Sequence, residues 1–181
     1  MKKVVLITGA NRGIGLETAK QMQARGYEVI LTSRNVDEGS AAARDLGVRF
    51  HPLDVVSAKS ISALYAYVDA EFGRLDALIN NAGILLDRKD SILDIPEEKL
   101  RTMFDTNTFA PLMLIRAFLP LMRAQNYGRI VNISSQLGAL GGFSDYTPAY
   151  RLSKLALNGI TLILADALKE TNILVNSVHP G

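Results

Sequence analysis

The chain has no cysteine among its 181 residues and only two histidines. The missing cysteines exclude disulfide bonds, thiolate nucleophiles and cysteine-ligated zinc sites. His51 and His179 lie far apart and lack the spacing of metal ligands, so we expect no metal site.

Strong charge of one sign and long apolar runs are also missing. Twenty basic against 18 acidic residues give a net charge of +2, and the dispersed basic residues form no stripe for nucleic acid. Polar residues interrupt the best candidate for a membrane span, and the apolar run 4–7 is too short for a signal peptide. We therefore expect a cytoplasmic protein that binds neither nucleic acid nor membrane.

Short β-rich apolar runs alternate regularly with segments of helical period. Strands are predicted at residues 3–8, 28–33, 48–53, 75–80, 129–134 and 173–179. Helices are predicted at residues 13–25, 37–46, 57–73, 96–124 and 149–170. Continuous apolar strands are typical of sheets covered by helices on both faces. The alternation, without linker or repeat, predicts one three-layer α/β domain over residues 1–181, with a doubly wound parallel sheet of six strands.

The first predicted strand runs directly into the segment 8–15, TGANRGIG, and then into a helix in which Ile14, Ala19 and Met22 should face inward. Its glycines permit a tight turn and close approach of the backbone to a phosphate, while the helix N-terminus offers free N–H groups. The glycine pattern alone is weak evidence, since a simple tight turn explains it equally well. Its position between the first strand and the first helix favours a dinucleotide-binding loop.

Arg34 follows the second predicted strand, where doubly wound sheets contact the adenosine ribose. An acidic residue there would hold a ribose 2′-hydroxyl, whereas an arginine accepts a 2′-phosphate. Residues 32–34 contain no acid. On its own Arg34 could equally be a solvated charge, but in a dinucleotide site it favours NADP over NAD.

Tyr150 and Lys154 open the last predicted helix in the sequence YRLSK. Residues four apart share a helix face, so the ammonium could lie beside the phenol and lower its pKa from about 10 toward 7. A solvated surface pair is the competing explanation. Ser134 and Ser135 end the fifth predicted strand at the same sheet edge, where a hydroxyl can bind a carbonyl oxygen. A serine hydrolase is excluded because there is no G-x-S-x-G elbow.

Pro111 lies within the long predicted helix, four residues after Asn107. Because proline has no N–H, it cannot donate to the Asn107 carbonyl as an α-helix requires. We therefore expect a kink at this point and a free Asn107 carbonyl oxygen.

Together, TGANRGIG, NNAG (residues 80–83), Asn107, Ser135, YRLSK and the terminal VNSVHPG strongly resemble the short-chain dehydrogenase/reductase family, most of all its carbonyl-reductase type. The match is collinear along the whole chain. The resemblance implies a Rossmann-type fold and an NADP(H)-dependent oxidoreductase. Its activity would be the transfer of hydride between the nicotinamide and a small-molecule carbonyl or alcohol.

The resemblance also implies individual roles. Tyr150 would be the acid/base, Lys154 its pKa partner and a ligand of the nicotinamide ribose, and Ser135 would orient the carbonyl. Asn107 would hold a water near Lys154. Ser135 is preferred to Ser134 because the family serine precedes x-x-G. The residues implied to contact the cofactor are Gly9, Asn11, Arg12, Gly13, Ile14, Gly15, Ser33, Arg34, Asp54, Val55, Asn81, Ala82, Gly83, Tyr150, Lys154, Pro180 and Gly181.

Family members continue beyond the Pro-Gly pair into a helical substrate lobe and a final strand, so we expect this chain to be C-terminally incomplete. The alternative function is a catalytically impaired nucleotide-binding or interaction module that lacks this lobe. A nucleotide-sugar epimerase of related fold is disfavoured, because three residues rather than two separate Gly9 from Gly13. The substrate is not readable from the sequence, and a homo-oligomer stays open.

Overall fold

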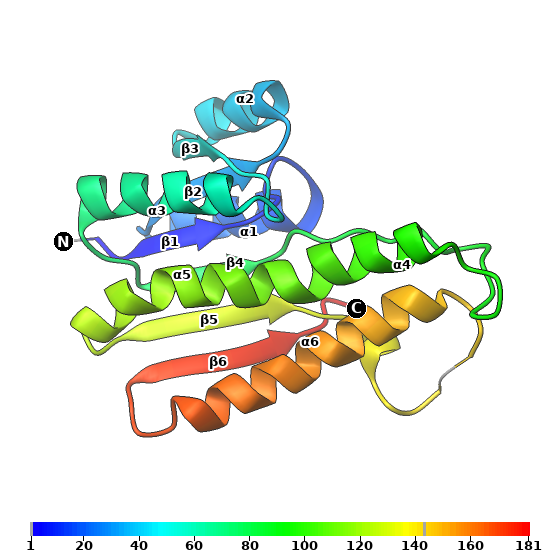
Figure 1. The fold of residues 1–181 in the computed structure, drawn as a ribbon. Helices are drawn as coiled ribbons and strands as arrows, with labels where there is room; N and C mark the ends of the chain where they lie inside the picture. The colour runs from blue at the N-terminus through cyan, green and yellow to red at the C-terminus, as the bar shows by residue number, and fades with distance from the viewer. Residues whose placement is uncertain (1, 143) are drawn as a thin grey trace.

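Six parallel strands in the described part of the chain form the central sheet, in the order β3-β2-β1-β4-β5-β6 (Figure 1). The computed structural model describes residues 2–142 and 144–181. The order reverses between β1 and β4, and such a switch point is where doubly wound sheets bind ligands. The predicted Rossmann-type fold is thus confirmed. The strands are Val4–Ile7 (β1), Glu28–Ser33 (β2), Arg49–Pro52 (β3), Ala77–Asn80 (β4), Gly128–Ile133 (β5) and Ile173–Val178 (β6).

Helices connect successive strands and pack on the sheet. Helices α1 and α2 contact β1, β2 and β3, whereas α3, α5 and α6 lie on the opposite face (Figure 1). No helix among the described residues is long and apolar enough to cross a membrane. The helices are Gly13–Ala24 (α1), Val36–Leu46 (α2), Ala58–Phe72 (α3), Glu97–Phe104 (α4), Ala110–Ala124 (α5) and Pro148–Ala167 (α6), with a π-helical stretch Asp105–Phe109 (η1) and a 3₁₀ turn Gln136–Gly138 (η2).

Side chains that alternate along the strands form two cores, one on each face of the sheet. Val4 and Leu6 pack with α3 and α5, and Val5 and Ile7 pack with α1 and α2. Burial of each such side chain contributes about 1.5–3 kcal/mol. The two cores therefore fix the strand register, which brings the carboxyl ends of the strands to one edge.

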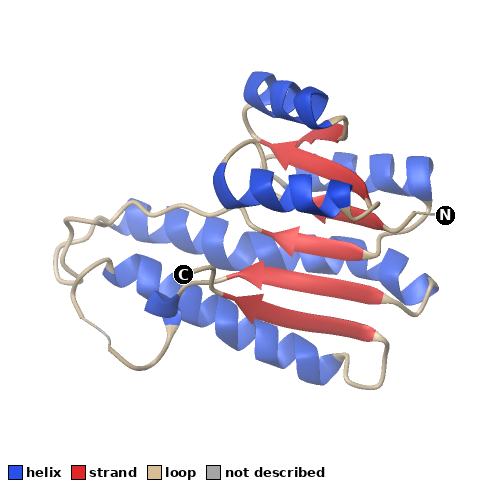
Figure 2. Ribbon diagram, turned by 180° about the vertical axis from the view of Figure 1, so that it is seen from behind, coloured by secondary structure: helices blue, strands red, loops and turns tan. Residues whose placement is uncertain are grey.

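The face that carries α1 and α2 is open over β5 and β6 (Figure 2). Val131 and Ile133 of β5 are only half-buried there, and Leu174 and Val178 of β6 are 49% and 44% exposed. The expectation of helices on both faces is therefore right for the β1–β3 half. For β5 and β6 it is wrong in the described part of the chain, where two layers replace three.

The single helix predicted over residues 96–124 is divided into α4, η1 and α5. Within η1, the Ala110 N–H donates to the Asp105 carbonyl five residues earlier. The irregularity expected before Pro111 is thus present as a π-helical stretch. This stretch places one extra residue in the turn before Pro111, which has no N–H to donate to the helix. The free carbonyl of Asn107 stays a prediction. Elsewhere the predicted element boundaries agree with the structure to within three residues.

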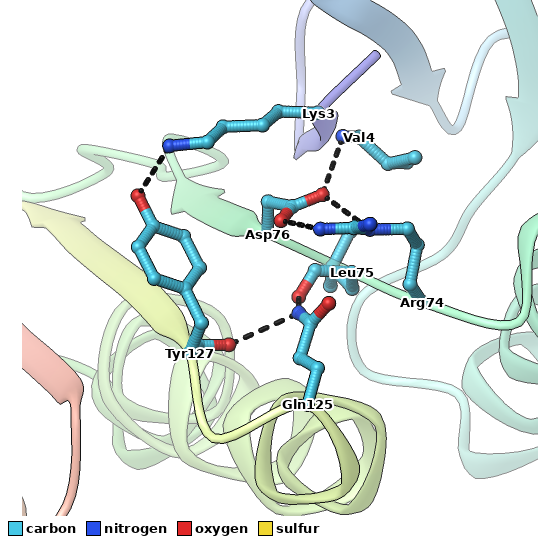
Figure 3. A network of polar contacts seen from close by, with 7 residues as sticks. All are labelled: Lys3, Val4, Arg74, Leu75, Asp76, Gln125 and Tyr127. Atoms are coloured by element: carbon cyan, nitrogen blue, oxygen red, sulfur yellow. Dashed lines mark hydrogen bonds and ion pairs between the residues drawn. The ribbon is translucent and has the colours of Figure 1, made fainter. Parts of the chain in front are cut away.

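Buried Asp76 connects the amino ends of the central strands (Figure 3). Its carboxylate accepts from the Val4 backbone N–H at 2.8 Å and forms a two-point ion pair with Arg74. In the same network, Gln125 donates to the Tyr127 carbonyl at 3.0 Å (Figure 3). The ion pair and the backbone hydrogen bond offset the cost of removing this carboxylate from water. Because the network lies at the edge opposite the ligand-binding end of the sheet, we assign it a structural role.

We expect the 181-residue chain on its own to self-associate through the open face of β6. Exposed apolar edge strands pair with other chains, and lysine on such a strand prevents the pairing. Replacing Leu174 and Val178 together with lysine should therefore reduce association in sedimentation velocity, with unchanged circular dichroism. Leu93→Lys, an exposed leucine in a loop, is the matched control. A wild-type chain that sediments as a monomer at all concentrations tested would contradict the prediction.

Candidate active site

A groove of about 730 Å³ lies at the carboxyl edge of the sheet, over the β1/β4 switch point. Its volume is typical of sites for cofactors and small molecules. The loops after β1, β2, β3 and β4 form its walls. The structure places in this lining eleven of the residues that the sequence predicts to contact a cofactor: Gly9, Asn11, Arg12, Gly13, Ile14, Arg34, Asp54, Val55, Asn81, Ala82 and Gly83.

The start of α1 has the properties of an anion site. Arg12, the N-cap residue, makes no side-chain capping bond, and the first turn contains no acid. The first N–H groups of a helix have no partner within the helix, so they present positive charge to the groove. A side chain added at Gly13 would meet no atom within 4 Å, which shows that the space over this turn is open. These residues fit the pyrophosphate of a dinucleotide.

Ile14 lies on the groove side of α1 and is 49% exposed, so the expectation that it faces inward is wrong. Ala19, one of the other two positions, is fully buried as predicted. The reason is position: Ile14 is in the first turn of α1, at the groove, whereas Ala19 packs in the core with β1 and β2.

Six predicted cofactor residues lie outside the groove lining: Gly15, Ser33, Tyr150, Lys154, Pro180 and Gly181. Gly15 and Ser33 lie next to it in the chain. A side chain at Gly15 would come within 2.8 Å of the Gly9 carbonyl oxygen, so this glycine permits close packing of α1 on the loop. Ser33 is buried, and its hydroxyl donates to the Asn35 carbonyl at the start of α2. The Ser33 side chain is therefore engaged in local structure rather than directed into the groove.

The two residues at the end of the chain also lie outside this groove. Pro180 lines a neighbouring hollow along α1 that shares Gly13 and Ile14 with the groove, and Gly181 is exposed. A contact of either residue with a cofactor stays a prediction.

Glu38 was not predicted from the sequence, yet it lines the groove that Arg12 and Arg34 also line. Its carboxylate accepts from the Asn11 side chain at 2.7 Å. The available signal was its spacing: Glu38 is four residues after Arg34, and its backbone N–H donates to the capping side chain of Asn35. Other lining residues that sequence reasoning missed are Asn35, Leu53, Val56, Ile84, Thr102, Asp105 and Thr106.

Hydrogen bonds join the loop after β1 to the loop after β4 beneath the groove. The Thr8 hydroxyl accepts from the backbone N–H groups of Asn81 at 3.0 Å and Ala82 at 2.9 Å. The Asn81 side chain donates in return to the carbonyls of Thr8 and Gly9, each at 2.9 Å. Asn81 and Ala82 of the NNAG segment therefore fix the floor of the groove.

Asn107 is fully buried, and its side chain links three elements. It accepts from the Ile84 N–H and donates to the Ile84 carbonyl, each at 2.8 Å, and it donates to the Ser153 hydroxyl of α6 at 3.1 Å. A side chain added at Gly83 would lie 3.3 Å from Asn107 Oδ1 and 3.5 Å from Lys154 Nζ. The structure thus brings Asn107 and Lys154 together next to Gly83.

The Lys154 ammonium is buried and donates to the Ile133 carbonyl at 2.7 Å. Burial lowers its pKa to about 8. Its Nζ atom lies 5.8 Å from the centre of the Tyr150 ring. Tyr150 and Lys154 therefore lie near each other on α6, as predicted. The Lys154 ammonium, however, points toward the end of β5.

Burial raises the pKa of Tyr150 above its ordinary value, while hydrogen bonding to Ser135 acts in the opposite direction. The expected lowering of this pKa by Lys154 is wrong for the structure as it stands. The reason is geometric, because the lysine is held by the Ile133 carbonyl rather than by the phenol. Ser135 is thus the serine that acts on the pKa of Tyr150. The choice of Ser135 over Ser134 as the carbonyl-orienting residue stays a prediction.

The turn that carries Ser135 packs tightly on α6 through Gly138. A side chain added at Gly138 would lie only 2.7 Å from Cβ and 2.8 Å from the backbone carbonyl carbon of Lys154. The Ser135 hydroxyl accepts from the Leu137 N–H at 3.2 Å at the start of η2. Glycine at residue 138 therefore allows Ser135, Tyr150 and Lys154 to gather at one place.

The family model for short chain dehydrogenases matches residues 3–181. This chain belongs to the short-chain dehydrogenase family. It is 37% identical to the short-chain dehydrogenase anuI of Penicillium roqueforti, over 99% of the chain and 78% of the relative. It is 31% identical to a (+)-neomenthol dehydrogenase of Arabidopsis thaliana, over 99% of the chain and 82% of the relative.

A similar solved structure is that of a metagenomic short-chain oxidoreductase in complex with NADP. The TM-score is 0.91 with 34% identity, over 99% of this chain and 82% of the other. A short-chain dehydrogenase from Streptomyces avermitilis gives a TM-score of 0.92 and 36% identity, over 100% of this chain and 66% of the other. The chain is thus a short-chain oxidoreductase in both sequence and fold.

Replacing Lys154 with methionine should stabilise the fold at pH 7. Because the pKa is lowered from 10.5 to about 8, the unfolded chain binds more protons between these pH values, so stability rises with pH in that window. Below pH 8 the cost of burying the charge is fully present. Lys154→Met removes this cost and loses one hydrogen bond, for a net gain of about 2 kcal/mol in the free energy of unfolding.

Urea unfolding at pH 7 and at pH 10.5 checks this prediction, since the gain should largely disappear at the higher pH. Lys169→Met, at an exposed lysine of the same region, is the control and should change stability little. A destabilised Lys154→Met variant at pH 7 would show that the hydrogen bond to Ile133 outweighs desolvation.

Proposed function

We propose that the chain is an NADP(H)-dependent oxidoreductase that interconverts a small-molecule carbonyl and its alcohol, with Tyr150 as acid/base. The observation that carries the proposal is the gathering of Ser135, Tyr150 and Lys154 at the same sheet edge as the nucleotide groove. Two hydroxyls and a buried ammonium at this place suit an oxygen that gains negative charge during reaction.

The residues of this chain would divide the chemistry as follows. Nicotinamide, when bound, supplies or accepts a hydride at the carbonyl carbon. Ser135 donates a hydrogen bond that orients the carbonyl oxygen, and Tyr150 gives that oxygen its phenolic proton as negative charge develops. The raised pKa of Tyr150 keeps the phenol protonated at neutral pH, as the acid of a reduction must be. The nearby Lys154 ammonium stabilises the phenolate that results.

Arg12 and Arg34 support a preference for NADP, because both line the groove and both offer charge-assisted hydrogen bonds to a 2′-phosphate. The similar structure that contains NADP supports the same preference. Glu38 acts against it, since its carboxylate would repel a phosphate in the same groove. Asn11 opposes this effect in part by donating to the Glu38 carboxylate.

Tyr150→Phe tests the chemistry. If Tyr150 is the proton donor, the variant should oxidise NADPH with a panel of ketones and aldehydes about 10²–10⁴-fold more slowly than wild type. NADPH binding, followed by nucleotide fluorescence, should be unchanged. Tyr146→Phe, at an exposed tyrosine in the preceding loop, is the matched control. Normal turnover in Tyr150→Phe would remove Tyr150 from the mechanism, and NADPH binding by a wild type that turns over no substrate would favour the binding-module alternative.

Paired substitutions in the groove test the cofactor preference. Arg34→Ala should weaken NADPH binding about 10- to 150-fold and hardly change NADH binding, because the lost bond is to the 2′-phosphate. Glu38→Gln, which removes a negative charge from the same groove but keeps an oxygen for Asn11, should strengthen NADPH binding. Equal effects on both nucleotides, measured by calorimetry, would refute the assignment to the 2′-phosphate.

A further inference from the structure

Asp87 is a fully buried carboxylate in the loop between β4 and α4. One of its oxygens, Oδ2, accepts from the backbone N–H groups of Ala149 at 2.7 Å and Tyr150 at 3.1 Å. Asp87 takes part in none of the salt bridges in the described part of the chain. The N-terminus of α6 is therefore the partner of Oδ2, while Oδ1 is buried without a hydrogen bond in the described part of the chain.

The local sequence of α6 leaves this N-terminus without a cap of its own. Thr147, the N-cap residue, has a positive φ of 52° and makes no side-chain capping bond. Pro148 has no N–H, and the backbone bond from Arg151 to the Thr147 carbonyl, at 3.0 Å, is the one that begins the helix. The N–H groups of Ala149 and Tyr150 thus lack an acceptor within the helix, and Asp87 supplies it from outside.

The carbonyl of Tyr150 is held as well as its N–H. The Ser153 hydroxyl donates to this carbonyl at 2.8 Å and accepts from Asn107 at 3.1 Å. Both backbone polar groups of Tyr150 are therefore engaged by buried side chains. The bonds to Asp87 connect Tyr150 to the loop that follows the groove floor, so they set the place of the phenol relative to the groove.

We propose that Asp87 is a positioning residue for Tyr150, a role that rests on the proposed function. It acts on the backbone of Tyr150 and makes no contact with substrate. A displacement of about 1 Å at a reacting group can cost about 10²-fold in rate, so loss of this anchor should lower kcat. Because Asp87 itself does not line the nucleotide groove, the KM for NADPH should change little.

The experiment compares Asp87→Ala and Asp87→Asn with wild type in the 181-residue chain. Residue-resolved hydrogen exchange by NMR follows the amides of Ala149 and Tyr150, with the Arg151 amide as an internal reference for the intact helix. Steady-state kinetics with NADPH and a carbonyl give kcat and KM. Asp145→Ala is the matched control, because exposed Asp145 also accepts a backbone N–H, from Ile92 at 2.7 Å, but accepts none from α6 in the described part of the chain.

In Asp87→Ala, protection of the Ala149 and Tyr150 amides should fall by at least about tenfold, with the Arg151 amide still protected. The kcat should fall about 10- to 100-fold at an unchanged KM for NADPH. Asp87→Asn, which keeps an oxygen acceptor without the charge, should be intermediate in both measurements. Asp145→Ala should resemble wild type. If Asp87→Ala does not fold, the comparison of Asp87→Asn with wild type decides.

Three results would overturn the proposal. The first is wild-type amide protection and wild-type kcat in both Asp87 variants, and the second is a fall in kcat without loss of protection at residues 149 and 150. The third is an alanine variant whose protection and kcat equal those of the asparagine variant. A wild-type chain that turns over no carbonyl would refute the proposed function instead. In that case the exchange pattern still shows whether Asp87 holds Tyr150.

Discussion

The hydrogen bonds of Thr8 with Asn81 and Ala82 hold the sheet together where its strand order reverses, and the site depends on them. They set the groove floor directly. They also place Gly83 and Ile84, and Ile84 is bonded to Asn107 through both its backbone polar groups. Parallel strands such as β1 and β4 are not joined by a tight turn that would align them. Hydrogen bonds between the loops that follow the two strands therefore help to fix their relative position.

The site contains two buried charges that do not neutralise each other. Lys154 is bonded to a backbone carbonyl, and Asp87 is bonded to backbone N–H groups. Each charge is thus compensated by oriented peptide dipoles, which cannot change their protonation. This arrangement leaves the lysine pKa sensitive to burial. Stability is lost at this position in return for a cation beside the proposed proton donor.

The features that could be predicted from sequence are those with a local cause. Alternating periodicity located the elements, and the glycine pattern located the α1 loop, because both depend on neighbouring residues. Asp87 could not be found in this way, since its partners lie 62 and 63 residues further along the chain. The direction of the Tyr150 pKa shift also could not be predicted, because it depends on burial and on where the Lys154 ammonium points. The inward orientation expected for Ile14 was wrong because helical period gives no information on where the sheet ends.

The open face of β6 affects more than surface chemistry, because β6 is hydrogen-bonded to the segment that carries Ser135. The Ser134 N–H donates to the Val178 carbonyl at 2.7 Å, at the last residue of the strand. Ile173 and Val175 anchor the start of β6 in the core, whereas residues 176–178 at its end are exposed. Segments with few buried contacts open locally at lower free energy than the core does. When the end of β6 opens, the neighbouring Ser135 loses a backbone restraint while Tyr150, held by Asp87 and Ser153, keeps its own. We therefore expect the two hydroxyls of the site to belong to regions of different local stability.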